Sequence, residues 1–279
     1  MSKTHTYVKG ADFPYQYKYE HMAVTTDCVI FTYEDWKLKV LLVRRGGEPC
    51  KGMWAFPGGF LRMDETAEQG ALRELREETS LEPSSPIVQL GVFSDVERDP
   101  RERVITIAFY ALVKPSEVMG GDDADEAAWF AIDSLPPLAF DHAKIFDAAM
   151  ERLRRDIHFQ PVGFDLLDDT FTIPDLQRLY EAILGVKFDR RNFQRKILSS
   201  GILEEVPMDE SASTYGEPEE LVCACMPEPE AFQEERAAPK GLLDEAPRKK
   251  SRPGRKGLWF SLNRNRYKEM KEDGLKQEF

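Results

Sequence analysis

Short hydrophobic runs separated by polar turns dominate the first half of the chain. Two β-rich runs begin at Ala23 and Leu38 and flank a turn-like stretch at Tyr33–Trp36, which predicts a hairpin. After a Gly/Pro-rich passage, three further apolar runs predict strands at 87–96, 104–113 and 127–132. This half of the chain is therefore expected to build a sheet.

Helical spacing replaces the strand pattern at two places in the same region. Good helix formers run from about Thr66 to Thr79, and apolar residues recur at helical intervals from His142 to about Arg155. Mixed strands with helices predict an α/β domain over 21–156. Residues 1–20 show no clear period and are assigned to an N-terminal arm.

The second domain, predicted over 160–279, begins with two helices in close succession. Thr172 can cap the first helix and Gly185 can end it, while Asp189 can cap the second and Gly201 can end that one. The connecting turn spans Gly185–Phe188. Two helices joined by so short a turn are typical of a helix-turn-helix unit.

Length and composition narrow the class of protein. A chain of 279 residues with 42% hydrophobic content predicts two compact units with real cores. Neither an apolar run of membrane-spanning length nor a signal peptide stands out, so we expect a cytoplasmic protein without a membrane partner. The Cys223-x-Cys225 pair lacks the further ligands that a structural zinc site needs.

Charge is distributed unevenly along the chain. The formal net charge is −12, and the segment Glu204–Ala246 alone contributes −11, from 13 acidic and 2 basic residues. With five prolines and little periodic apolar content, this segment is predicted to be an unstructured insertion. Pro247–Lys268 then carries nine basic residues and no acidic one, which favours an anionic partner.

Three carboxylates share one face of the first predicted helix. Glu74, Glu77 and Glu78 stand at i, i+3 and i+4, and such clustered anions repel each other unless cations neutralise them. Oxygen-only ligands select Mg²⁺ or Mn²⁺, which bridge to phosphate oxygens. Gly58, in the predicted Pro57–Gly59 turn, can present a backbone carbonyl to the same ions, and Arg73 can hold a glutamate in place. The alternative is a solvated charged helix.

The second helix of the C-terminal pair predicts a DNA contact. Phe193, Ile197 and Leu198 are assigned to its buried side. Its other side carries side chains able to bond base edges or phosphates, namely Arg190, Arg191, Asn192, Gln194, Arg195 and Lys196. The segment Pro253–Phe260 is predicted to be a hairpin tip and returning strand, which together form a wing. Arg252, Arg255 and Lys256 of this region are available to bind phosphate. The alternatives are a solvated basic face or a protein-docking module.

The segment from Gly59 to Leu81 resembles the Nudix box. The motif begins with Gly59, five residues, Glu65, seven residues and Arg73-Glu74. It continues with an aliphatic residue, any residue, Glu77-Glu78 and any residue, and it ends with a glycine position and an aliphatic residue. Ser80 stands at the glycine position. The resemblance implies an α/β/α sandwich that binds a nucleoside diphosphate linked to another group. In catalytic members Arg73, Glu74, Glu77 and Glu78 would serve the reaction, with metal held by the glutamates and Gly58 or Gly59.

A wider resemblance links both halves to the Nudix-related transcriptional regulators. It rests on Phe171–Gly185, on Asp189–Lys196 and on Leu138–Ile145. It implies a winged helix that binds double-stranded operator DNA as a homodimer and releases it when a metabolite such as ADP-ribose or a sugar fills the Nudix pocket. Ligand contacts would fall to Gly59, Glu65, Asp141 and His142, although a capped helix start also accounts for the last two.

Two functions remain open from the sequence. The first is a ligand-responsive transcriptional regulator. The second is an active Mg²⁺-dependent Nudix hydrolase of the ADP-ribose pyrophosphatase type, and the intact glutamates favour it. A further loop carboxylate would act as base or ligand, with Glu97, Asp99, Asp125 and Glu126 as candidates. Ser80 is expected near the end of the helix, where glycine adopts a left-handed conformation easily.

Overall fold

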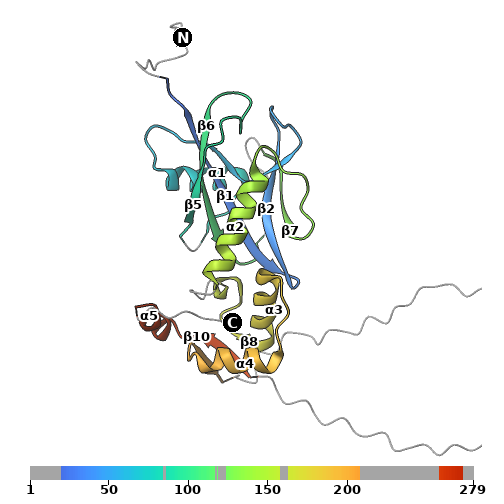
Figure 1. Ribbon diagram of the computed structural model, residues 1–279, viewed down its shortest axis with the longest axis vertical. Helices are drawn as coiled ribbons and strands as arrows, with labels where there is room; N and C mark the ends of the chain where they lie inside the picture. Colours follow the sequence, from blue (N-terminus) through green and yellow to red (C-terminus); the bar gives the residue numbers. More distant parts are fainter. Residues whose placement is uncertain are drawn as a thin grey trace, which may run out of the picture.

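Two units lie one above the other in the computed structural model (Figure 1). The structure describes residues 20–83, 86–116, 118, 124–157, 163–207 and 258–272. The upper unit is a mixed sheet with helices on both faces, and the lower unit is a helix-turn-helix with a small sheet. The α/β fold followed by a winged helix, expected from the sequence, is confirmed.

The upper sheet is built on the predicted hairpin. Strands β1 (Ala23–Glu34) and β2 (Lys37–Arg45) pair antiparallel across Asp35 and Trp36, which both have positive φ angles. β1 also pairs in parallel with β6, so β1 lies in the middle of the order β3-β2-β1-β6-β5. The remaining strands are β3 (Trp54–Ala55), β4 (Gly58–Phe60), β5 (Val88–Phe93), β6 (Val104–Leu112) and β7 (Ala124–Ala131).

Alternation along β1 divides the core into two layers. Cys28 and Ile30 belong to a cluster with Leu75 of helix α1 (Ala67–Thr79). Val29 and Phe31 belong to a second cluster with helix α2 (His142–Asp156). Because successive side chains of a strand point to opposite faces, a strand covered on both sides becomes a continuous apolar run. This is the pattern that the sequence shows.

Helix α1 has well-defined ends. Thr66 caps it in a reciprocal capping box with Gln69. At the other end, Ser80 adopts φ 59°, a left-handed conformation, and its backbone N–H donates to the carbonyl of Arg76 at 2.9 Å. The expected role of the Ser80 position at the helix end is confirmed.

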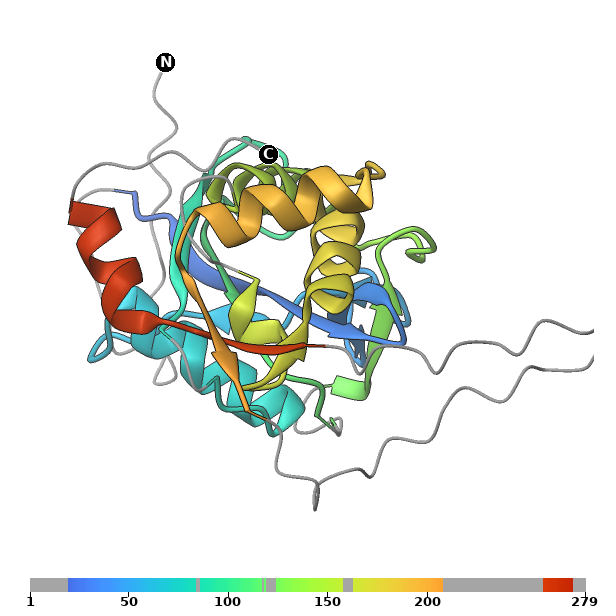
Figure 2. The same cartoon turned by 90° about the horizontal axis from the view of Figure 1, so that it is seen from below.

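The lower unit confirms the helix-turn-helix prediction. Thr172 caps α3 (Ile173–Leu184), Gly185 ends it at φ 70°, and Asp189 caps α4 (Arg190–Ser199). A three-stranded sheet of order β8-β10-β9 packs beside the helices, and α5 follows β10. Figure 2 shows α4 and this sheet from below. The other elements are η1 (Phe164–Leu166), β8 (Phe171–Thr172), β9 (Leu203–Val206), β10 (Trp259–Leu262) and α5 (Arg264–Glu272).

Three local expectations need correction. Gly58 and Gly59 lie in strand β4, paired with β1, and not in a turn. Leu198 is 41% exposed, because Phe193 and Ile197 alone fill the inward face of α4. The first residues of the predicted insertion, Glu204 to Val206, belong to strand β9, which pairs with β10. By contrast, the expected stop of α4 at Gly201 is confirmed, because the helix ends at Ser199 with Ser200 as its cap and Gly201 follows at φ 69°.

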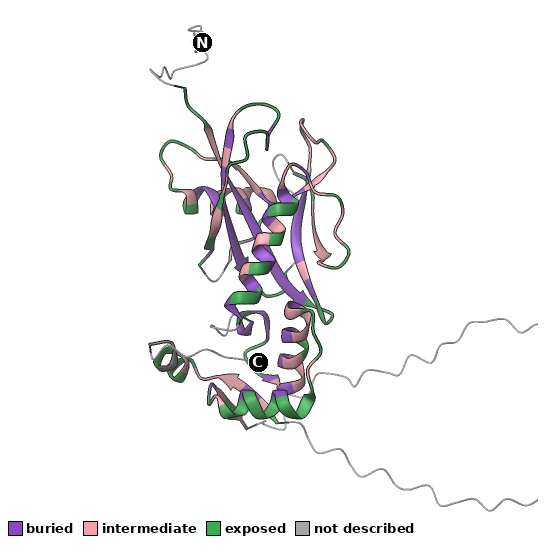
Figure 3. Ribbon diagram, viewed as in Figure 1, coloured by how far each residue is buried: buried purple, intermediate pink, exposed green. Residues whose placement is uncertain are grey.

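The two units share one hydrophobic cluster. Residues of β1, β2 and α2 join residues of α3, α4 and β10 in it without interruption, and Figure 3 shows this buried column in purple. At its margin the Arg154 Nε donates to the carbonyl of Ile183 at 3.1 Å, linking the end of α2 to α3. None of the helices in the described ranges is long and apolar enough to cross a membrane.

Candidate functional site

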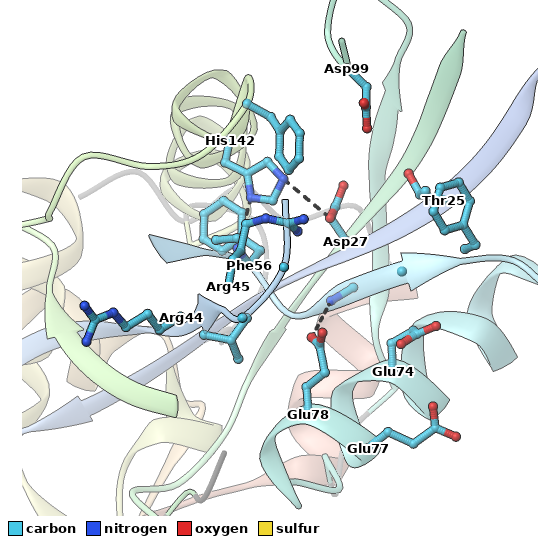
Figure 4. Close-up of a pocket in the computed structure, with 18 of the residues that line it drawn as sticks. Thr25, Asp27, Arg44, Arg45, Phe56, Glu74, Glu77, Glu78, Asp99 and His142 are labelled. Carbon is cyan, nitrogen blue, oxygen red and sulfur yellow. Dashed lines mark hydrogen bonds and ion pairs between the residues drawn. The ribbon is translucent and has the colours of Figure 1, made fainter. Parts of the chain in front are cut away.

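A cavity of about 790 Å³ opens between α1, β4, the end of β2 and the start of α2 (Figure 4). Strand β4 places its two glycines along one wall, and α1 supplies the carboxylates of Glu74, Glu77 and Glu78 beside them. The helical spacing read from the sequence is therefore the spacing that aims these groups at the cavity. The three glutamates, Gly58, Gly59 and Arg73, all named from the sequence, line it together.

Arg73 organises the outer carboxylates. Its guanidinium donates to Glu65 through Nε and Nη2 at 2.9 and 2.6 Å, and Nη1 donates to Glu74 and Glu77 at 2.6 and 2.9 Å. The hydrogen bonds from Arg73 lower the pKa of Glu65 to about 2. Both oxygens of Glu65 are occupied in this way, and Glu65 does not line the cavity.

Glu78 lies deeper than its two neighbours. Its Oε2 accepts the backbone N–H of Gly58 at 2.9 Å. Burial raises the pKa of Glu78 to about 8, and the nearby charges of Glu74 and Asp27 act in the same direction, against the hydrogen bond from Gly58. A carboxyl group in such surroundings gains most from a cation that would neutralise it.

The glycines of β4 allow the backbone to approach closely. A Cβ atom at Gly58 would lie 2.1 Å from the carbonyl oxygen of Thr26, and one at Gly59 would lie 2.5 Å from Oε1 of Glu74. A side chain at position 58 would therefore clash with the neighbouring strand, whereas the absence of one at Gly59 leaves room for the carboxylate of Glu74. The Nudix-box glycine matched by Gly59 has a steric reason in this chain.

A buried polar cluster lies at the floor of the cavity, and the sequence did not predict its members Asp27, Arg98 and Thr106. Asp27 of β1 accepts the hydroxyl of Thr106 at 2.6 Å, and its carboxylate lies 3.8 Å from Nη2 of Arg98. Arg98 in turn donates to Asp141 through two bonds of 3.1 and 2.8 Å. The available signal was one acidic residue inside the hydrophobic run of β1, because a buried charge needs partners.

His142 completes this cluster as a neutral ring. Its Nδ1 accepts the backbone N–H of Phe56 at 3.0 Å, so a neutral ring carries its proton on Nε2, which lies 3.6 Å from Oδ1 of Asp27. Burial lowers the pKa of His142, which favours this neutral state. The side chain of Asp141 makes no capping bond to α2, since both its oxygens bind Arg98.

The remaining candidates are spread around the cavity. His142 lines it, whereas Asp141 does not. Among the proposed extra carboxylates, Asp99 lines the cavity but is bonded to Arg101, Glu97 is exposed outside it, and Glu126 lies 3.9 Å from Arg44. The side chain of Asp125 lies outside the described residues.

Helix α4 presents a basic face to solvent. The six residues named as DNA contacts are all exposed, namely Arg190, Arg191, Asn192, Gln194, Arg195 and Lys196. Figure 3 shows this exposed face in green along the underside of the molecule. The wing residues Arg252, Arg255 and Lys256 lie outside the described residues.

Fold and site together define a Nudix domain joined to a DNA-binding winged helix. The family model for the NUDIX domain matches residues 22–149, and that for the NrtR DNA-binding winged helix domain matches 163–219. The chain is 30% identical over 199 residues to the ADPR responsive transcriptional repressor NtrR of Acinetobacter baylyi, covering 70% of this chain and 79% of the relative. This chain belongs to the NrtR family of Nudix-related transcriptional regulators.

Two further relatives bear on the separate halves. An ADP-ribose pyrophosphatase of Methanocaldococcus jannaschii is 44% identical over 138 residues, which cover 50% of this chain and 79% of that protein. The crystal structure of Shewanella oneidensis NrtR complexed with a 27mer DNA is similar at 27% identity and a TM-score of 0.61, covering 88% of this chain and 95% of the other. One relative therefore matches the Nudix half, and the other spans both halves.

Proposed function

We propose that this chain is a DNA-binding transcriptional regulator whose Nudix pocket binds ADP-ribose or a related metabolite. The observation that carries this proposal is the single hydrophobic cluster that joins the pocket elements β1 and α2 to the helix-turn-helix. A ligand that shifts β1 or α2 acts directly on the packing of α3. The repressor of Acinetobacter baylyi is named as responsive to ADPR, which supports the same ligand class here.

The DNA-binding surface is α4, with the wing as a second contact. Arg190, Arg191 and Arg195 stand at the exposed face of a helix that follows a tight turn, where a recognition helix meets base edges and phosphates. We place the DNA-binding domain at 160–279 and the Nudix domain at 21–156. We expect a homodimer on a pseudo-palindromic operator, because two half-sites need two recognition helices.

The residues of the pocket fit a hard divalent cation. Glu74 and Glu78, with Glu77 and a carbonyl of Gly58 or Gly59, offer the oxygen donors that Mg²⁺ or Mn²⁺ requires. Within the described ranges no three acidic, histidine or cysteine side chains are already gathered around a common point. Arg73 accounts for this, since it holds Glu74 and Glu77. The bound ion would neutralise Glu78 and the phosphates of the ligand.

The test couples the two sites in one experiment. Operator sequences are first selected from genomic DNA with the full-length protein, and DNA affinity is then measured by gel shift while ADP-ribose and Mg²⁺ are added. We expect DNA affinity to fall with ADP-ribose, and to stay constant in a Glu74→Gln/Glu78→Gln variant that binds DNA normally. Unchanged DNA affinity at a saturating concentration of ADP-ribose would contradict the proposal.

A second candidate function is hydrolysis of ADP-ribose. All three glutamates and Arg73 are in place at the cavity, and the pyrophosphatase of Methanocaldococcus jannaschii is similar over the same half. Release of AMP from ADP-ribose with Mg²⁺, abolished in Glu77→Gln/Glu78→Gln, would establish turnover. Binding of ADP-ribose without AMP release would leave the Nudix domain as a sensor.

A further inference from the structure

We propose that Phe140 and Arg45 form the platform that receives the nucleobase of the ligand, at one end of the cavity. This inference rests on the proposed function, since it assigns the nucleoside end of an ADP-ribose-like ligand. The two sides of the cavity are lined by residues of unlike chemistry. In Figure 4, Arg44, Arg45, Phe56 and His142 lie on one side, and Thr25 and Asp99 lie on the other.

Phe140 has an unusual backbone conformation at the end of the cavity beside Arg45. Its φ angle is 51°, in the left-handed region that side chains larger than glycine rarely adopt. The segment is fixed on both sides, because Ala139 N–H donates to Trp54 at 2.8 Å and His142 N–H donates to Ala139 at 3.1 Å. Such strained residues gather at ligand sites. Here the conformation keeps a half-buried aromatic ring at the cavity wall.

The guanidinium of Arg45 lies over this ring, and its charge is available to a ligand. The guanidinium carbon is 4.8 Å from the centre of the Phe140 ring, and Nε donates to the carbonyl of Pro49 at 3.0 Å. Within the described part of the chain, no carboxylate lies within ion-pair distance of Arg45. In a nucleoside diphosphate the base is separated from the first phosphate by one ribose. An arginine beside an aromatic ring therefore suits a base that stacks and a phosphate that follows.

Buried apolar side chains back the cavity wall near Phe140. Val43 and Ala55 are paired across β2 and β3, and the Phe56 ring stacks on His142 with centroids 5.3 Å apart. All of these residues line the cavity. A planar base entering here stacks on the Phe140 ring in front of this apolar layer, while its ribose and phosphates extend toward the glutamates of α1.

A further phenylalanine of the cavity, Phe60, lies in different surroundings. Its side chain is 43% exposed, and the Arg101 guanidinium covers its ring at 5.3 Å. Two hydrogen bonds of 3.1 and 2.7 Å tie Arg101 to Asp99, so this cover is fixed. The end of the cavity beside Phe60 is charged and suits the hydroxyl groups of a ligand. Phe60 is therefore the matched control for Phe140.

The test compares ligands with and without a base on the full-length protein. Calorimetric titration with Mg²⁺ gives the dissociation constants of ADP-ribose, ADP and inorganic pyrophosphate for the wild type, Phe140→Ala, Phe140→Leu and Phe60→Ala. Stacking on an aromatic ring is worth roughly tenfold or more in affinity. We expect Phe140→Ala to weaken ADP-ribose and ADP by about that factor and pyrophosphate by less than about twofold. Phe60→Ala should leave ADP unaffected.

The outcomes separate this inference from the proposed function. If the wild type binds ADP-ribose and Phe140→Ala binds ADP as tightly as the wild type does, the assignment of the platform is wrong and the proposed function stands. If the wild type binds no ADP-ribose, both are overturned. A parallel loss of pyrophosphate and ADP affinity also overturns the platform. Phe140→Leu retains an apolar side chain of similar size, so an ADP affinity that falls in this variant with unchanged thermal unfolding supports stacking rather than a folding defect.

Discussion

The guanidinium of Arg178 lies 4.2 Å from the centre of the Trp36 ring, and this contact joins the β1–β2 hairpin to the first helix of the DNA-binding domain. Tyr33, seven per cent exposed, is buried near the end of the same hairpin. Asp27, in the first half of β1, lines the cavity. One strand thus reaches from the ligand pocket to the helix-turn-helix.

The Trp36–Arg178 contact should be measurable as a coupling energy. Both side chains are about half exposed, so a cation–π contact is worth about 0.5–1 kcal/mol. A double-mutant cycle of Trp36→Ala and Arg178→Ala, followed by urea unfolding, should return this value. Lys37→Ala, on the same hairpin, should add to Arg178→Ala without coupling. A coupling energy near zero would show that the contact contributes no stability.

Replacing Ser80 by glycine should stabilise the protein. A serine at φ 59° strains the backbone, and glycine adopts that conformation freely, which predicts a gain of about 1 kcal/mol in the free energy of unfolding. Ser80→Ala retains the Cβ atom and should show no gain. Equal stability of Ser80→Gly and Ser80→Ala in chemical denaturation would refute the steric account.

The two glycines of β4 should respond differently to alanine. Gly58→Ala forces a methyl group against the backbone of Thr26 and should cost about 2 kcal/mol of stability. Gly59→Ala meets the flexible end of Glu74, so it should weaken ligand binding more than it lowers the unfolding midpoint. Thermal unfolding and ADP-ribose titration of both variants check this, and the reverse order of effects would argue against the described positions.

Removing two arginines of α4 should weaken DNA binding and its dependence on salt. Arg190→Ala/Arg191→Ala removes two exposed charges, so the slope of log affinity against log salt should decrease by about 2. Gel shifts between low and moderate salt measure the slope. The double variant Lys37→Ala/Lys51→Ala removes two exposed charges from the Nudix domain and should leave the slope intact. Undiminished affinity in the α4 variant would exclude this helix.

His142 should make stability depend on pH below neutrality. Burial lowers its pKa in the folded protein below the value of about 6.5 in an unfolded chain, so the unfolded state binds the proton more readily. Its contribution is complete above about pH 6.5 and declines as the pH falls toward the folded pKa. Urea unfolding between pH 7 and 5 should show a smaller decline in His142→Gln than in the wild type. Identical slopes would mean that the pKa of His142 is the same in the folded and unfolded protein.

Patterns within a few residues were sufficient to predict much of this protein. The spacing of Glu74, Glu77 and Glu78 placed three carboxylates on one helix face, and Thr172, Gly185 and Asp189 marked the limits of α3 and α4. Capping and i, i+4 geometry depend on neighbours in the chain, so the sequence contains them in full. The two-domain α/β and winged-helix architecture followed from the order of these elements.

The tertiary structure alone decided which distant residues share the cavity. Arg98 and Asp141 are 43 positions apart, and Asp27 meets Thr106 across 79 positions, through the parallel pairing of β1 and β6. Strand order has no local signature, so the chain gave no sign that Asp27, Arg98 and His142 meet. The same holds for the shared core of the two domains, because an apolar residue does not reveal which element will cover it.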